Sequence, residues 1–234
     1  MNRFTNHFGL PDFGPLEQQK LQKAHVLLVG AGGLGCPIAL YLASAGIGKM
    51  TIVDGDHVEK SNLNRQIAYG ENHIGLSKSK VLSEQLLEKY SDIEVIGIHE
   101  YASEQNVLEW VKEADLVIDA TDRFNSRYLL SDACKKEHKP LILGAVHSYE
   151  GQVFCFTCDQ QLSDSNYYRD LFPNPPQLGE IPTCNDTGVL GVLTGIIGCM
   201  MAYECIKHFI SVIDHNYILY YDLKNYNISK FTIN

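Results

Sequence analysis

The chain has 234 residues, of which 45% are hydrophobic, and its formal net charge is −9. These values predict one α/β domain, 1–234, and the negative charge argues against nucleic acid or an anionic membrane as a partner. No uninterrupted apolar run reaches the roughly 18 residues of a membrane span, and residues 1–10 lack the apolar core of a signal peptide. We therefore expect a cytoplasmic protein, in which the seven cysteines are free thiols, metal ligands or catalytic groups rather than a disulfide framework.

Strands and helices are predicted to alternate over the first 144 residues, after an N-terminal arm and helix at 1–24. Apolar runs predict strands, and helical spacing of apolar residues predicts the helices between them. This alternation implies right-handed crossovers, so the expected fold class is α/β and Rossmann-like, with a mostly parallel sheet flanked by helices. The expected strands are 25–29, 50–53, 94–98, 116–120 and 140–144, and the expected helices are 15–23, 36–45, 78–89, 104–113 and 127–137.

The pattern changes after residue 144. A strand of antiparallel type is expected at 151–157, and two more antiparallel strands at 218–222 and 228–233 close the chain. Between them lie a Pro-rich crossover loop, 159–182, and an apolar helix, 188–209. A structureless loop of this length usually carries function or is disordered. The helix is apolar nearly all round, with Gly191, Gly195 and Gly198 allowing close approach, so we expect it in the core or in a dimer interface.

The turn between the first strand and the helix that follows it contains four glycines: Gly30, Gly32, Gly33 and Gly35. Such a turn lets the backbone approach a phosphate at a helix N-terminus. Asp54 ends the next strand, where a carboxylate suits ribose hydroxyls. Together they predict nucleotide binding, although a plain tight turn is the structural alternative and the fingerprint alone favours NAD or FAD.

Three further residues favour a triphosphate over a dinucleotide. Arg65 and Lys78 supply positive charge, and Asp122 suits Mg²⁺ bound through one carboxylate. Taken singly, Arg65 and Lys78 are equally well explained as solvated surface residues. Asp122, taken singly, could be a helix N-cap. Because all three follow the carboxyl ends of parallel strands, we expect them to meet in one site for ATP and magnesium.

These motifs resemble a known family. Residues 26–66 read VLLVGAGGLGCPIALYLASAGIGKMTIVDGDHVEKSNLNRQ, and GLSK ends at Lys78, DATD ends at Asp122 and TCNDTGVLGVLTGIIG spans 183–198. The chain is similar to the ThiF/MoeB/HesA family, relatives of the ubiquitin-activating enzymes. The resemblance implies a homodimer that uses ATP to adenylate the C-terminal Gly-Gly carboxylate of a small ubiquitin-like sulfur-carrier protein, ThiS or MoaD, for thiamine or molybdopterin biosynthesis.

The resemblance also implies roles for individual residues. Gly33 would approach the nucleotide through its backbone, Asp54 would hold the ribose, and Asp122 would bind magnesium. Cys184 matches a cysteine that can attack the adenylated carrier, and a buried inert thiol is the alternative. The remaining expected nucleotide contacts are Ser61, Asn62, Asn64, Arg65, Lys78 and Arg123.

The first departure from the family concerns zinc, which many members hold with two C-x-x-C pairs. Tyr167 and Asp170 stand where the first pair is expected, and no cysteine follows Cys205. Because a four-thiolate zinc site needs both pairs, we expect zinc to be absent. The Pro-rich region would then be held by packing, through Tyr167, Tyr168 and Phe172.

The second departure is in the N-terminal arm. Arg3 matches the first arginine of a family motif, but Asn6 replaces the second, which in relatives reaches the ATP of the partner subunit. Either Arg3 substitutes for it, or Arg123 supplies the charge.

Two other functions stay open: an NAD(P)-dependent oxidoreductase, and a carrier-binding module with weakened catalysis. The choice between ThiS and MoaD also stays open.

Overall fold

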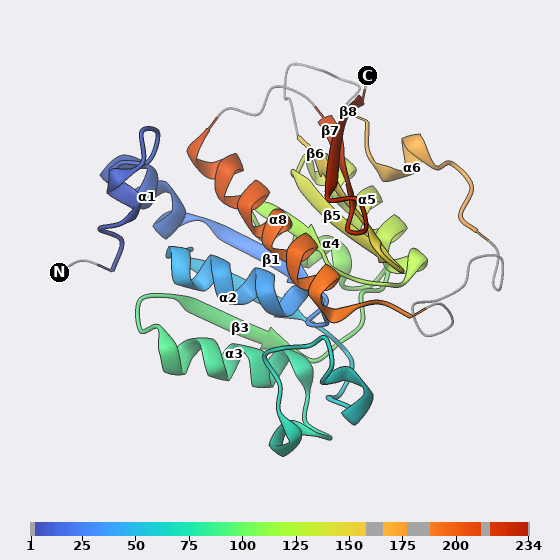
Figure 1. Ribbon diagram of the computed structural model, residues 1–234, viewed down its shortest axis with the longest axis horizontal. Coiled ribbons are helices and arrows are strands. Elements are labelled where there is room, and N and C mark those ends of the chain that lie inside the picture. The colour runs from blue at the N-terminus through green and yellow to red at the C-terminus, as the bar shows by residue number, and fades with distance from the viewer. Residues whose placement is uncertain (1–2, 158–165, 177–187, 212–215, 234) are drawn as a thin grey trace.

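A computed structural model describes residues 3–157, 166–176, 188–211 and 216–233. One eight-stranded sheet forms its centre, in the order β3-β2-β1-β4-β5-β6-β7-β8 (Figure 1). Neighbouring strands from β3 to β5 are parallel, and those from β5 to β8 are antiparallel. The predicted fold class, a mostly parallel sheet with antiparallel C-terminal strands, is confirmed.

The predicted elements are present, and their ends differ from prediction by a few residues. The strands are β1 (His25–Val29), β2 (Lys49–Val53), β3 (Glu94–Ile98), β4 (Leu116–Asp119), β5 (Leu141–His147), β6 (Glu150–Phe156), β7 (Asn216–Asp222) and β8 (Asn227–Ile233). The helices are α1 (Pro15–Lys23), α2 (Gly35–Ala45), α3 (Lys78–Lys89), α4 (Val107–Glu113), α5 (Phe124–Glu137), α6 (Tyr168–Leu171), which was not predicted, and α8 (Gly191–Ile210).

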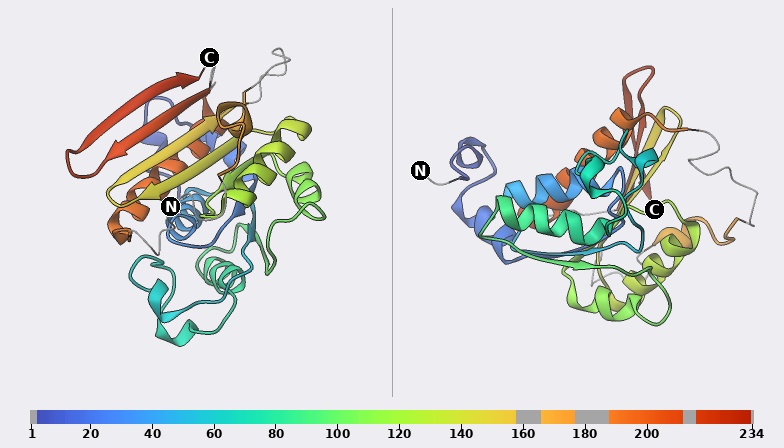
Figure 2. Two further views of the ribbon diagram at one scale, coloured as in Figure 1. Left: turned by 90° about the vertical axis from the view of Figure 1, so that its right-hand side faces the viewer. Right: turned by 90° about the horizontal axis from the view of Figure 1, so that it is seen from below.

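The sheet separates two hydrophobic cores, because successive side chains of a strand point to opposite faces. In β1, Val26 and Leu28 belong to one core, whereas Leu27 and Val29 belong to the other. Helices α2, α3 and α8 cover the first face, and α4, α5 and α6 cover the second (Figure 2). Because both faces are covered, the central strands are buried apolar runs.

Helix α8 lies across α2 and strands β5 and β6. A Cβ atom at Gly198 would come within 2.7 Å of the Leu34 carbonyl oxygen, and one at Gly191 within 2.3 Å of the Asn64 carbonyl oxygen, so both glycines permit close approach as predicted. A Cβ atom at Gly195 would meet no atom within 4 Å, so the close approach expected there stays a prediction. Within the described ranges, α8 is the one helix whose length and apolar composition would suit a membrane span, and its buried face belongs to the core.

An aromatic cluster stands where the family resemblance led us to look for the first zinc pair. Tyr167 is 2% exposed and stacks on Phe156, and its hydroxyl donates to the Lys139 carbonyl oxygen at 2.8 Å. Asp170 forms an ion pair with Lys135 at 2.7 Å. The predicted packing role is confirmed for the described residues, whereas the absence of zinc stays a prediction. The members of the cluster are Tyr128, Phe154, Phe156, Tyr167, Tyr168 and Phe172.

Candidate nucleotide-binding site

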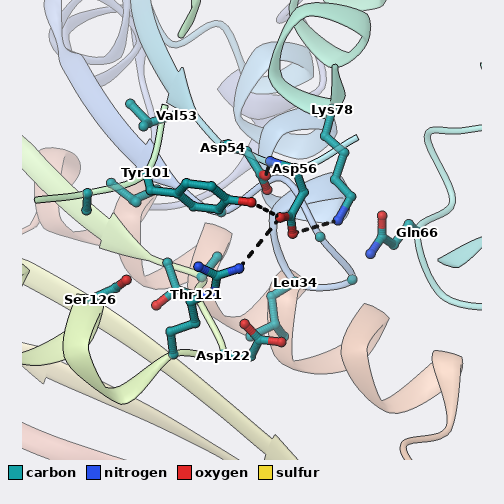
Figure 3. Close-up of a pocket in the computed structure, with 18 of the residues that line it drawn as sticks. Leu34, Val53, Asp54, Asp56, Gln66, Lys78, Tyr101, Thr121, Asp122 and Ser126 are labelled. Atoms are coloured by element: carbon teal, nitrogen blue, oxygen red, sulfur yellow. Dashed lines mark hydrogen bonds and ion pairs between the residues drawn. The ribbon is translucent and has the colours of Figure 1, made fainter. Parts of the chain in front are cut away.

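A pocket lies at the carboxyl ends of β1, β2, β3 and β4, and its empty space, with the open solvent at its mouth included, is about 920 Å³ (Figure 3). The loop after each of these strands contributes to its wall. The expected residues that line it are Gly30, Gly32, Gly33, Asp54, Arg65, Lys78, Asp122 and Arg123. The structure therefore brings the glycine turn, the acidic residue and the cations into one site.

The glycines of the turn serve two different purposes. Gly30 has a φ of +99°, and a Cβ atom there would lie 2.6 Å from the Ala120 carbonyl oxygen. A Cβ atom at Gly35 would lie 1.9 Å from the Gly30 carbonyl oxygen. These two positions need glycine so that the turn and α2 can pack. Gly32 and Gly33, which line the pocket together with Gly30, leave bare backbone at the N-terminus of α2, where an anion is favoured.

Asp54 is fixed by backbone amides at the middle of the pocket. Its Oδ2 accepts a hydrogen bond from Ala31 N–H at 2.7 Å, and its Oδ1 accepts one from Asp56 N–H at 2.8 Å. Burial raises the pKa of Asp54, and the two amides oppose that rise. A carboxylate has about four acceptor sites, so this rigidly held group still has acceptor capacity for ribose hydroxyls.

Asp56 joins three other pocket side chains, and sequence reasoning missed it. Lys78 Nζ lies 3.2 Å from Asp56 Oδ2, the Tyr101 hydroxyl donates to Oδ1 at 2.5 Å, and an Arg123 nitrogen lies 3.7 Å from Oδ1 (Figure 3). Partial burial would raise the pKa of Asp56, but the bond from Tyr101 and the charge of Lys78 outweigh it and lower that pKa. The sequence feature that could have identified Asp56 is its position two residues after Asp54.

Arg65 is oriented by its own loop. Its Nη1 donates to the Ser61 carbonyl oxygen and to Asn64 Oδ1, both at 3.1 Å. The buried Asn62 accepts a hydrogen bond from Glu59 N–H at 3.3 Å. Ser61, Asn62 and Asn64 do not line the pocket. They shape the loop that presents Arg65, and their direct contact with a nucleotide stays a prediction.

Asp122 lies exposed in the pocket wall. Helix α5 is preceded by Arg123 at its N-cap position, and in the described part of the chain no hydrogen bond is found for the Asp122 carboxylate. The N-cap alternative is therefore not supported. No cluster of three or more His, Cys, Asp or Glu side chains within the described ranges could hold a metal ion. Magnesium bound through Asp122 and nucleotide phosphates fits this arrangement.

Buried polar atoms without partners gather at the same place. Among the described residues, Gln66 Oε1, Asp119 Oδ2 and Arg127 Nε are buried and lack a hydrogen-bond partner. Gln66 and Arg127 line the pocket, and Asp119 lies immediately before Ala120 of its wall. Complete burial raises the pKa of Asp119. Unpaired buried groups are rare and costly in native proteins, and sequence reasoning predicted none of these three.

Arg3 lies away from the pocket of its own subunit. Its Nη2 donates to the Ala43 carbonyl oxygen at 3.2 Å, and its Nη1 pairs with Asp92 at 2.9 Å. Ala43 belongs to the C-terminal end of α2, whereas the pocket lies at the N-terminal end of that helix. The structure does not bring Arg3 to the site, and its contact with a partner subunit's ATP stays a prediction.

Most cysteines in the described part of the chain are buried. Cys36, Cys134, Cys155 and Cys205 are buried free thiols, and Cys199 is a half-buried one. Burial raises the pKa of Cys36 to about 11 and that of Cys155 to about 12, which keeps both protonated near neutral pH. Cys184, the expected nucleophile, lies outside the described residues.

Comparison with known proteins gives the same family as the motifs. The ThiF family model matches residues 4–234. Maize adenylyltransferase and sulfurtransferase MOCS3-1 is 45% identical over 88% of this chain and 43% of its own length, so the chain spans less than half of that relative. The SAMP-activating enzyme E1 of Haloferax volcanii is 39% identical over 88% of this chain and 75% of its own length.

Solved structures support the fold. A crystal structure of E. coli MccB has a TM-score of 0.83 at 21% identity and covers 99% of this chain and 72% of that one. A structure of the same protein with ATP has a TM-score of 0.75 at 22% identity and covers 93% of this chain and 66% of that one. Since the family model spans nearly the whole chain and a relative is matched over most of its length, the protein belongs to the ThiF family.

Proposed function

We propose that the protein is an ATP-dependent adenylyltransferase that activates the C-terminal Gly-Gly carboxylate of a small ubiquitin-like sulfur carrier of ThiS or MoaD type. The observation that carries this proposal is the convergence of Gly32–Gly33, Asp54, Arg65, Lys78 and Asp122 in one pocket. The maize relative is named as an adenylyltransferase and the Haloferax relative as an activating enzyme, which supports the same reaction class.

The proposed reaction is an in-line displacement at the α-phosphorus of ATP. A carrier carboxylate oxygen forms the new bond to phosphorus while the bond to the pyrophosphate oxygen breaks, which gives a carrier acyl-adenylate and pyrophosphate. The carboxylate is already ionised near neutral pH, so no general base is needed. Catalysis then rests on positioning and charge neutralisation. The Gly32–Gly33 backbone, Arg65 and Lys78 provide these for the phosphates, and magnesium at Asp122 would add positive charge.

An NAD(P)-dependent oxidoreductase is the competing function. It uses the glycine turn and Asp54 but gives no role to Arg65, Lys78 or Asp122. Titration of the protein with ATP and with NAD, each with and without magnesium, separates the two. We expect ATP to bind more tightly when magnesium is present and NAD to bind weakly. Tight NAD binding that does not depend on magnesium would reject the proposed function.

The homodimer and the cytoplasmic location also belong to this proposal. Exposed apolar side chains on the outer faces of α2 and α8 support a dimer: Tyr41 is 56% exposed, Val192 62% and Tyr203 60%. A monomer would leave these side chains in water. Light scattering at micromolar concentration should give twice the mass of the chain, and a concentration-independent monomer would contradict this.

A further inference from the structure

At the mouth of the pocket, Arg123, an expected nucleotide contact, stacks on Tyr101, which was not expected in the site. Tyr101 follows β3 and Arg123 follows β4, yet the Arg123 guanidinium carbon lies 4.4 Å from the centre of the Tyr101 ring. Both side chains line the pocket. Tyr101 is 50% exposed and the Arg123 side chain 57% exposed, so the stack borders on solvent.

The position of the stack follows from the order of the strands. The glycine turn follows β1, Asp54 follows β2, and Tyr101 follows β3, which is the next strand outward in the sheet. A nucleotide with its phosphates on the turn and its ribose at Asp54 therefore has its base toward Tyr101. Figure 3 shows the same order, with Lys78 and Gln66 on one side of Asp54 and Tyr101 and Ser126 on the other.

The Tyr101 ring is held firmly on one side. A Cβ atom at Gly55 would lie 2.7 Å from two ring carbons, so one face of the ring packs directly against the Gly55 backbone. The hydroxyl donates to Asp56 at 2.5 Å, and the Tyr101 carbonyl oxygen accepts a hydrogen bond from Asn106 at 3.0 Å. The ring is therefore a fixed surface whose other face points toward Arg123.

The Arg123 guanidinium is held more weakly. It contacts the Tyr101 ring and pairs with Asp56 at 3.7 Å, and its side chain is more than half exposed. Exposed cation–π contacts and exposed ion pairs each contribute little. A planar ligand that inserts between the Tyr101 ring and the Arg123 guanidinium displaces only the loosely held guanidinium. The ligand then contacts the aromatic ring on one face and the cation on the other.

We propose that Tyr101 is a specificity-determining residue on which the nucleobase of ATP stacks, and that the Arg123 guanidinium moves aside to cover the outer face of the base. This inference rests on the proposed function and adds the base subsite to it. Stacking recognises the flat face of a base rather than its edge. The pair therefore selects nucleotides over base-free polyphosphates.

The test compares the affinities of ATP and inorganic tripolyphosphate, which carries the charge but no base. Tyr101→Ala should weaken ATP binding about 5- to 140-fold, the range found for base–aromatic stacking, and leave tripolyphosphate binding unchanged. Tyr101→Trp should keep ATP affinity close to that of the unaltered protein, because the platform remains. Arg123→Ala should weaken ATP about 2- to 5-fold. Tyr226→Ala, on an exposed turn, is the control.

Each outcome decides one point. Equal ATP affinity of the Tyr101→Ala variant and the unaltered protein would overturn the base platform while leaving the proposed function intact. Parallel weakening of ATP and tripolyphosphate would also overturn it, since the loss would then concern the phosphate end. If the unaltered protein binds no ATP at all, the proposed function fails and the platform fails with it.

Discussion

The aromatic cluster and the nucleotide pocket treat their buried polar groups in opposite ways. In the cluster, the Tyr128 hydroxyl donates to the Phe172 carbonyl oxygen at 2.8 Å, and Tyr168 N–H donates to Ser131 Oγ at 3.1 Å. At the pocket, Gln66 Oε1 and Arg127 Nε are buried without partners in the described part of the chain. Satisfied groups stabilise a fold, whereas unsatisfied ones are costly and mark places that a ligand completes.

The comparison predicts that the cluster governs stability and the pocket governs activity. Tyr167→Ala should show the largest effect on stability, about 3–5 kcal/mol in urea unfolding, because a fully buried aromatic ring is lost. Tyr167→Phe keeps the ring and removes the hydroxyl that donates to the Lys139 carbonyl oxygen, for a cost of about 1 kcal/mol. ATP affinity should not change in Tyr167→Phe. A cost below about 1 kcal/mol for Tyr167→Ala would show that something other than packing holds this region.

Arg65→Ala and Asp122→Ala test the pocket side of the comparison. Each should lower carrier-dependent exchange of pyrophosphate into ATP about 100- to 1000-fold, as expected when a group that stabilises transition-state charge is removed. Asp122→Ala should change the free energy of unfolding by less than about 0.5 kcal/mol, because its side chain is exposed. Lys80→Ala, an exposed residue of α3, is the matched control. Normal exchange in both variants would refute the assigned roles.

Within the glycine turn, two single substitutions should separate stability from binding. Gly35→Ala should destabilise the protein by about 3 kcal/mol, because the added methyl group meets the Gly30 carbonyl oxygen. Gly32→Ala meets no atom closer than 3.7 Å, so unfolding should change little while ATP binding weakens about tenfold or more. Calorimetric titration and thermal unfolding measure both. The division between the glycines is wrong if Gly32→Ala unfolds the protein and Gly35→Ala does not.

The smallest effect concerns the ion pair beside the aromatic cluster. Partial burial alone would raise the pKa of the Asp170 carboxyl group. The hydrogen bonds from Lys135 and from Tyr167 N–H outweigh burial and lower this pKa from its ordinary value. A lowered pKa stabilises the fold above the unfolded-state value, and this contribution is lost as the pH falls through the folded-state pKa. Asp170→Asn should therefore cost less than about 1 kcal/mol at neutral pH, as expected for an exposed ion pair, and nothing in strong acid. Glu104→Gln is the exposed control, and a pH-independent cost would contradict the assignment.

Local patterns predicted most of the fold, because strands and helices follow apolar spacing and turn residues that lie close in sequence. Helix 15–23 begins at Pro15, a favourable first helical position, and has the predicted ends. The helix predicted at 104–113 instead begins at Val107, because Ser103 N–H donates to Asn106 Oδ1 at 2.8 Å and holds a turn ahead of it. Such side-chain turns are hard to read from apolar spacing alone.

The site was predictable where its residues share one motif. Gly30 and Asp54 were found from the turn and the end of the next strand. Asp56 was missed because its partners, Lys78 and Tyr101, come from distant segments that meet only in the folded sheet. Tertiary convergence of this kind leaves no local pattern, and it also explains why the stack of Tyr101 was not foreseen.

The central claim is tested most directly by the exchange of labelled pyrophosphate into ATP in the presence of a ThiS-type or MoaD-type carrier. We expect exchange with the intact carrier, dependent on magnesium, and none with the same carrier lacking its terminal glycine. Absence of exchange with both intact carriers, or exchange that continues with the truncated carrier, would contradict the proposed adenylation of the carrier C-terminus.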